Sequence, residues 1–175
     1  MGTTTAGGTW SVDSMYHTVV NVTDLDRSVA FYERLGFRVL DDRRHVHWPD
    51  FVATNFGMRV AQGQGVLMVL AADGNGPMLD LIRWLEPDPA TLEPDVPRDL
   101  RIPRILAFRA TNVRALYDEL TAEGFPFTNE FTGPFAELGI IGVCCVQDPD
   151  GTIIEFMELE PGVRHSRAKR LEQRR

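Results

Sequence analysis

Three polar side chains interrupt stretches of this sequence that otherwise have the apolar, β-branched character of strands. His17 lies in MYHTVVNV, Asp80 in MLDLIRW and Glu155 in TIIEFMEL. A charged group in such a strand needs a partner, because burying it unpaired is unfavourable. Imidazole nitrogen and carboxylate oxygen suit Zn²⁺, Mn²⁺, Co²⁺, Ni²⁺ or Fe²⁺. The three residues are therefore candidate ligands of one divalent metal, and Asp80 and Glu155 are also candidate catalytic carboxylates.

A metal-free pocket is the alternative interpretation of the same residues. In that case His17 is hydrogen-bonded within the fold, and the two carboxylates pair with arginines. The candidate partners are Arg83, Arg104 and Arg109.

Aromatic and basic residues near these strands are candidates to line a small-molecule pocket. Such pockets are mostly apolar and contain a few polar groups that fix the ligand. The residues that we expect in the lining are Trp48, Phe51, Phe56, Trp84, Ile105 and Arg109.

The elements that hold these residues follow a pattern that starts at residue 15. Residues 15–22 alternate as a half-buried strand does. Residues 23–26 (TDLD) form an N-cap signal, and the apolar spacing that follows predicts a helix that ends at Gly36. Residues 37–40 then predict a second strand.

The same pattern returns in the second half of the chain. Residues 102–110 predict a strand, residues 111–112 a helix cap, Gly124 the end of that helix, and Phe125 the start of a strand. Gly36 and Gly124 are 88 residues apart, as are Leu25 and Val113. A constant offset through strand, cap, helix and glycine indicates an internal repeat. The repeat places Ile105 at the position equivalent to His17.

Each half continues with a hairpin, so each is predicted to be a βαβββ module. The hairpins are 65–70 with 77–84 and 139–146 with 152–159, joined by Asp-Gly or Asn-Gly turns. We expect an α+β fold in which two tandem βαβββ modules form a curved mixed sheet around a cleft. The predicted parts are a disordered leader (1–13), the first module (14–86), a Pro- and acid-rich linker (87–101), the second module (102–161) and a basic tail (162–175).

Composition narrows the class of protein. The chain has 175 residues, of which 43% are hydrophobic, and a formal net charge of −7. An acidic chain of this kind argues against a general nucleic-acid surface. No apolar run approaches the length of a membrane span, and residues 1–10 do not resemble a secretory signal. With Cys144 and Cys145 interpreted as small buried hydrophobes, we expect a cytoplasmic protein in a reducing compartment.

Two motifs resemble the vicinal oxygen chelate superfamily. MYHTVVNVTDLDRSVAFYERLGFRVL is similar to its opening and DPDGTIIEFMEL to its closing motif, so the resemblance covers residues 15–160. The superfamily includes glyoxalase I, methylmalonyl-CoA epimerase, extradiol dioxygenases, and bleomycin and fosfomycin resistance proteins. Metal-binding members take ligands from the first and last strand of each half, which here are His17, Asp80, Ile105 and Glu155. This sequence departs from the full set at Ile105, where a histidine is expected, and at Asp80, where Glu or Gln is more usual.

The resemblance implies two classes of function. MLDLIRWLEP is similar to the glyoxalase and epimerase branch, which implies a metal-assisted isomerase or lyase acting through an enolate of a small carbonyl or acyl-thioester substrate. His17 and Glu155 would then hold the metal, and Asp80 would be a third ligand or the base.

The alternative is a metal-free binding protein of the bleomycin-resistance type. Ile105 favours it, because an apolar residue at a metal-ligand position makes the pocket more apolar and excludes water. Ile105 also argues against extradiol cleavage, which needs two histidines and a carboxylate on Fe(II). In either class we expect a small-molecule partner and a homodimer.

Overall fold

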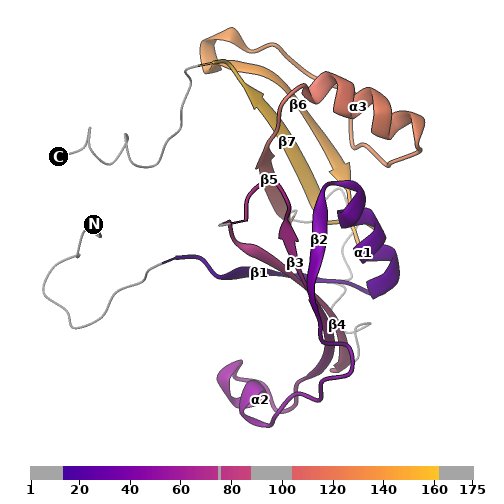
Figure 1. Ribbon diagram of the computed structural model, residues 1–175, viewed down its shortest axis with the longest axis vertical. Coiled ribbons are helices and arrows are strands. Elements are labelled where there is room, and N and C mark those ends of the chain that lie inside the picture. Colours follow the sequence, from indigo (N-terminus) through magenta and orange to yellow (C-terminus); the bar gives the residue numbers. More distant parts are fainter. Residues whose placement is uncertain (1–13, 75, 88–103, 162–175) are drawn as a thin grey trace, which may run out of the picture. The chain divides into compact units, whose positions relative to one another are not determined.

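The computed structural model describes residues 14–74, 76–87 and 104–161. The expected leader, most of the linker and the basic tail lie outside the described residues. The chain divides into two compact units, Met1–Asp95 and Val96–Arg175, which we call the first and second unit (Figure 1). The described part contains no helix that is long and apolar enough to cross a membrane. Each unit has its own sheet, and the expected α+β class with two βαβββ-like modules is confirmed.

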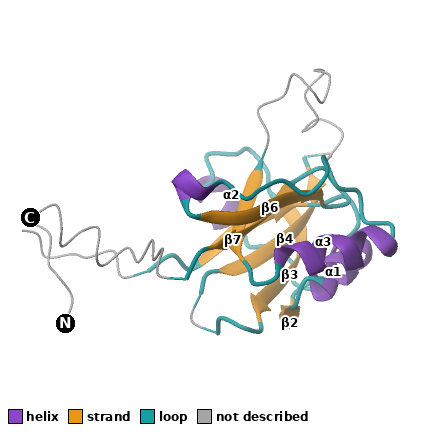
Figure 2. Cartoon of the chain, turned by 90° about the horizontal axis from the view of Figure 1, so that it is seen from above, coloured by secondary structure: helices purple, strands orange, loops and turns teal. Residues whose placement is uncertain are grey.

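The first unit is a four-stranded sheet in the order β1-β4-β3-β2. β1 runs parallel to β4, and the other neighbours are antiparallel. Helix α1 packs on one face of the sheet, and the short helix α2 lies between β2 and β3 in the chain (Figure 2). The elements are β1 (His17–Asn21), α1 (Leu25–Arg34), β2 (Phe37–Asp42), α2 (Phe51–Asn55), β3 (Gln62–Leu70) and β4 (Met78–Glu86).

Helix α1 begins and ends at residues with clear local reasons. Asp24 is the N-cap, where its carboxylate accepts a hydrogen bond from the Arg27 N–H at 3.0 Å. This bond lowers the pKa of Asp24. Gly36, with φ of +93°, lies just past the helix, where a left-handed residue is usually glycine.

Alternation of side chains gives the first sheet two different faces. The face toward α1 is the core, and its fully buried strand residues are Val66, Met68 and Leu81. The opposite side, which we call the distal face, carries His17, Val19, Gly65, Asp80 and Ile82. The candidate polar residues of this unit therefore lie away from the core.

The second unit is a three-stranded sheet in the order β5-β7-β6, with β5 parallel to β7. Helix α3 packs on its buried face, which includes Cys144, Val146 and Ile154. The elements are β5 (Ile105–Arg109), α3 (Val113–Ala122), the 3-10 helix η3 (Ala136–Leu138), β6 (Ile140–Gln147) and β7 (Ile153–Leu159).

One local expectation for the second unit is wrong. No regular strand begins at Phe125: the segment 125–135 makes only isolated bridges to β6, because its aromatic rings turn onto α3. Phe127 lies 4.7 Å from Tyr117, ring centre to ring centre. Asn112 is the N-cap residue of α3, as expected, but its side chain makes no capping hydrogen bond, and the Val113 N–H donates instead to the Glu158 carboxylate at 2.9 Å.

The internal repeat is visible in the element bounds and in the strand register. β5 and α3 begin and end 88 residues after β1 and α1. In the first unit Val19 is opposite Asp80, and in the second Ala107 is opposite Glu155. Since each pair lies two residues along from the start of the parallel ladder, Asp80 and Glu155 occupy equivalent positions.

Candidate functional site

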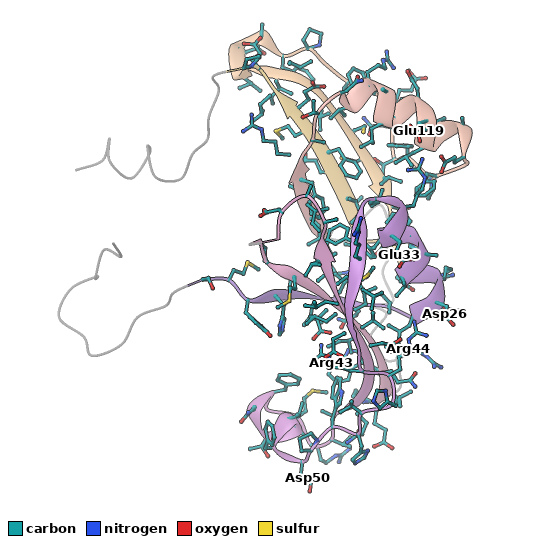
Figure 3. The ribbon with its side chains drawn as sticks, viewed as in Figure 1. Asp26, Glu33, Arg43, Arg44, Asp50 and Glu119 are labelled. Atoms are coloured by element: carbon teal, nitrogen blue, oxygen red, sulfur yellow. The ribbon has the colours of Figure 1, made fainter. Side chains whose placement is uncertain are left out.

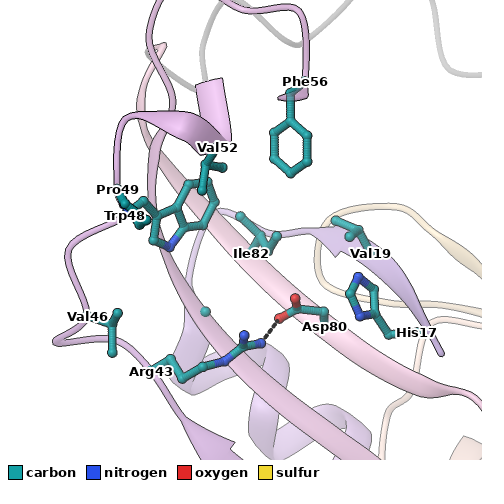
Figure 4. A pocket seen from close by; sticks show the side chains of 11 residues that line it. His17, Val19, Arg43, Val46, Trp48, Pro49, Val52, Phe56, Asp80 and Ile82 are labelled. Carbon is teal, nitrogen blue, oxygen red and sulfur yellow. Dashed lines mark hydrogen bonds and ion pairs between the residues drawn. The ribbon is translucent and has the colours of Figure 1, made fainter. Parts of the chain in front are cut away.

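A cavity of about 280 Å³ lies on the distal face of the first unit (Figure 4). This volume is just below the usual range for ligand pockets, which begins at about 300 Å³. β1, β3, β4 and the connection from β2 through α2 supply the lining. The lining residues are His17, Val19, Arg43, Val46, Trp48, Pro49, Val52, Phe56, Gly65, Asp80 and Ile82.

Two glycines of β3 make room for the groups in and beside this pocket. A Cβ atom at Gly65 would lie 3.4 Å from the Asp80 Oδ1 atom. A Cβ atom at Gly63 would lie 2.7 Å and 2.8 Å from two ring carbons of Trp48, which is closer than side chains approach. The absence of a side chain at Gly63 therefore lets the Trp48 ring lie directly over the backbone of β3. At Gly65 a Cβ atom alone would be in ordinary contact with Asp80, and only a larger side chain would fill the space beside the carboxylate.

Trp48 forms a fixed aromatic wall. Its ring contacts Trp84 edge to face, with ring centres 5.4 Å apart. The Trp84 indole N–H donates to the Asn21 side-chain oxygen at 2.9 Å. The Gln62 amide bonds both the N–H and the C=O of Trp48, at 3.2 Å and 2.9 Å. These contacts attach the wall to β3 and β4, so the wall is preorganised.

The polar centre of the pocket is an ion pair between Arg43 and Asp80. The Arg43 Nη2 atom donates to Asp80 Oδ1 at 2.9 Å, and the Asp80 side chain is only 9% exposed. The Arg43 backbone N–H also donates to the Gly65 C=O at 2.9 Å. Both ends of Arg43 are therefore held beside the pocket floor (Figure 4).

Arg43 was not among the partners expected for Asp80. Arg83 instead donates to the Gln64 side chain at 3.2 Å. The physical reason is the strand order, because β3 separates β2 from β4 and its glycine lets an arginine reach across. The sequence signal was Gly65 itself, since a glycine inside an apolar strand marks a close approach of other groups.

The expected site residues divide between the two units. His17, Asp80, Trp48 and Phe56 line the first-unit pocket, whereas Trp84 supports it from behind Trp48. Phe51 is 62% exposed and is outside the lining. The expected residues of the second unit are Ile105 and Arg109 on β5, both exposed, and Glu155 on β7, which is half-buried.

Glu155 has a different setting from Asp80. It lies between Ala107 and Cys145 in the strand register. Burial raises the pKa of the Cys145 thiol, and the Glu155 carboxylate adds to this increase. Burial also raises the pKa of Cys144 to about 12, so both thiols are poor nucleophiles at neutral pH.

The donors in the first unit do not by themselves fit a divalent metal. His17 and Asp80 are the candidate ligands in the pocket, and Asp80 is already bound to a guanidinium cation. Ile105, at the position equivalent to His17, has no donor atom. No group of three His, Cys, Asp or Glu side chains suited to a metal gathers among the residues that the structure describes. A metal site would need Asp80 to exchange its partner.

Comparison with known families identifies the superfamily. The model of the glyoxalase/bleomycin resistance protein/dioxygenase superfamily matches residues 14–156, and the chain belongs to this superfamily. No match is found among curated protein sequences.

Solved structures share the fold at low sequence identity. A glyoxalase family protein from Bacillus cereus is 16% identical with a TM-score of 0.70, over 89% of this chain and 100% of that one. The trypanothione-dependent glyoxalase I of Leishmania major is 23% identical with a TM-score of 0.58, over 93% and 97%. TnmS3, an antibiotic binding protein from Streptomyces sp. CB03234, is 22% identical with a TM-score of 0.58, over 86% and 99%. Because the superfamily contains both enzymes and binding proteins, belonging to it does not define the activity of this chain, which depends on the residues of the site.

Proposed function

We propose that this protein binds a small, largely apolar ring compound in the first-unit pocket without a metal ion. The observation that carries the proposal is the Arg43–Asp80 ion pair, which occupies the carboxylate that a metal would need. Around this pair the lining is mostly apolar, with Trp48 and Phe56 as aromatic members. A mostly apolar pocket with one polar centre is the usual design of a small-molecule site.

The packing of the wall supports the same function. Trp48 is held by a neighbouring ring and by two hydrogen bonds to its backbone. A wall that is rigid before the ligand arrives loses little conformational freedom on binding. TnmS3 is described as an antibiotic binding protein, and a cytoplasmic small-molecule-binding role of that general class fits the pocket of this chain.

The test is binding of N-phenyl-1-naphthylamine, an uncharged dye that fluoresces in apolar surroundings, in buffer containing EDTA. We expect saturable binding that Trp48→Ala abolishes. Phe51→Ala is the matched control, because this exposed ring of α2 is outside the lining and its loss is expected to leave the affinity unchanged. Absence of saturable binding by the wild-type protein would contradict the proposal.

The second candidate is a metal-assisted isomerase or lyase of the glyoxalase or epimerase type. One observation favours it: Asp80 and Glu155 occupy equivalent register positions in the two units, and His17 shares a pocket with Asp80. This function requires that metal binding displace Arg43 from Asp80. It would be supported by turnover of a carbonyl or acyl-thioester substrate that EDTA abolishes, and a homodimer would be compatible with either function.

A further inference from the structure

We propose that the first-unit pocket selects uncharged ring compounds that carry a hydrogen-bond-accepting oxygen, and that Arg43 binds this oxygen. The inference rests on the proposed binding function and specifies the chemistry of its ligand. It follows from the donors, the charge balance and the shape of the pocket floor.

The polar group that the pocket offers is a donor. A guanidinium has five N–H donors and no acceptor. The hydrogen bond to Asp80 uses one N–H group of the Arg43 Nη2 atom. The Nε atom is buried and lies 3.7 Å from the Asp41 carboxylate, so it is not available to a ligand, and the donors on offer are the remaining N–H groups of the two terminal nitrogen atoms. The Arg43 side chain is 37% exposed, so part of its guanidinium remains accessible from the pocket. A ligand that satisfies it must present an oxygen or nitrogen acceptor.

The charge balance of the lining disfavours an anion. Besides His17, the lining contains one cation and one anion, Arg43 and Asp80, and these are in direct contact at 2.9 Å. Outside the lining, the exposed Asp41 carboxylate lies 3.7 Å from Arg43 Nε and adds a second negative charge beside the guanidinium. A carboxylate ligand at Arg43 would lie close to the negative charge of Asp80 and would also lose its hydration. A carbonyl oxygen accepts the same hydrogen bond without either penalty.

The shape of the floor favours a flat ligand. Gly65 contributes no side chain beneath the ion pair, and Trp48 and Phe56 supply ring surfaces above it (Figure 4). Arg43 is held by Asp80 and by the backbone of Gly65, so its position is set before binding. A planar ring with an oxygen at one edge matches this combination.

The experiment is displacement of N-phenyl-1-naphthylamine at pH 8 by three compounds that share one ring system. They are 2-acetonaphthone, which is uncharged and has a carbonyl, 2-ethylnaphthalene, which lacks the oxygen, and 2-naphthoate, which is an anion. We expect 2-acetonaphthone to bind about tenfold more tightly than either of the others, since a hydrogen bond to a charged group has this magnitude.

Arg43→Met is expected to remove this preference by weakening 2-acetonaphthone to the level of 2-ethylnaphthalene. Arg43→Met with Asp80→Asn keeps the pocket free of an unpaired buried carboxylate and guards against misfolding of the single variant. Arg44→Met is the matched control: the adjacent Arg44 is bound to Asp26 of α1 at 2.6 Å and is outside the lining (Figure 3). It should leave all three affinities unchanged.

Asp80→Asn alone tests whether the negative charge of Asp80 disfavours an anionic ligand. It keeps an acceptor for Arg43 but removes the buried negative charge of the lining and leaves only the exposed Asp41 carboxylate beside Arg43, so 2-naphthoate should gain several-fold relative to 2-acetonaphthone. The inference is overturned if wild-type protein prefers 2-naphthoate, if the carbonyl preference survives in both Arg43 variants, or if none of the three compounds displaces a dye that does bind. Failure of the dye itself to bind would overturn the proposed function as well.

Discussion

The strands β1-β4-β3 of the first unit and β5-β7-β6 of the second share their order and register, and the first unit adds β2 at one edge, but the glycines of β3 and β6 lie on different faces of the two sheets. In the first unit Gly65 lies opposite Ile82 on the distal face; the equivalent residue of the second unit is Val143, opposite Met157. On the other face of each sheet the glycine is in the second unit: Gln64 lies opposite Arg83 in the first unit, and the equivalent Gly142 lies opposite Glu158 in the second. Gly65 therefore leaves a gap on the distal face of the first sheet, whereas Gly142 leaves a gap on the other face of the second sheet.

Each opening is filled by a different kind of group. In the first unit, Gly63 admits the Trp48 ring, and Gly65 leaves open space beside the Asp80 carboxylate on the face that carries the pocket. In the second, Gly142 admits the ring of Phe131, which also lies under the Arg114 guanidinium at 4.4 Å on α3. Glycines on equivalent strands therefore serve a candidate binding pocket in one repeat and the packing of an aromatic ring in the other.

The largest effect is expected from making the first unit like the second with Gly65→Val. The added side chain would start 3.4 Å from Asp80 Oδ1 and 4.0 Å from Arg43 Nη2, and its methyl groups would fill the pocket floor. Dye affinity should fall about tenfold to a hundredfold, while circular dichroism shows a folded protein, because valine suits a strand. Val143→Gly is the reciprocal control and should leave the dye affinity unchanged. Equal losses of affinity in both variants would contradict the claim that the pocket depends on the glycine of the first unit.

The next effect concerns the two equivalent carboxylates. Asp80→Ala removes the buried carboxylate partner of the Arg43 guanidinium, leaves only the exposed Asp41 at 3.7 Å, and should lower the free energy of unfolding by about 1–3 kcal/mol. Glu155 is half-buried and makes no hydrogen bond or ion pair with the described residues. Glu155→Ala should therefore change the free energy of unfolding by only about 0.5 kcal/mol. Urea unfolding of both variants measures the difference, and equal values would mean that the ion pair contributes nothing.

A smaller effect separates stability from binding. Gly142→Ala places a Cβ atom where the Phe131 ring lies and should destabilise the fold by about 1–2 kcal/mol without changing dye affinity. Gly63→Ala displaces the Trp48 ring and should weaken dye binding instead. Thermal unfolding and dye titration of both variants check this, and a binding loss in Gly142→Ala would contradict the division of roles.

The smallest effect is on cysteine reactivity in the second unit. A raised pKa lowers the thiolate fraction at a given pH, so both thiols should react with iodoacetamide more slowly than a free thiol at pH 8. Glu155→Gln removes the smaller of the two causes at Cys145 and should speed its alkylation a few-fold. Mass spectrometry of the labelled protein measures this, with Cys144 as the internal control, and an unchanged Cys145 rate would refute the role of Glu155.

Much of the fold could be predicted from the sequence because its signals are local. Alternating apolar residues, Gly36 and Gly124, and the 88-residue offset correctly predicted the strands and helices of both units. The missing strand at residues 125–135 could not be predicted, since it depends on aromatic contacts with α3.

The site could be predicted only in part. His17, Asp80, Trp48 and Phe56, which their polar or aromatic type on strands and loops makes candidates, line one pocket, and their roles in a site stay a prediction. Arg43 was missed, because its pairing with Asp80 depends on the order β4-β3-β2 and on a glycine between them. Whether Glu155 acts with these residues stays a prediction.

The most direct test of the central claim is a calorimetric titration of EDTA-treated protein, without a His tag, with Zn²⁺, Mn²⁺ and Ni²⁺. If the polar centre of the first unit is the Arg43–Asp80 pair, no metal should bind stoichiometrically to the wild-type protein. Binding of one equivalent that is lost in His17→Ala, Asp80→Ala and Glu155→Ala would contradict this account and support the metal-assisted enzyme.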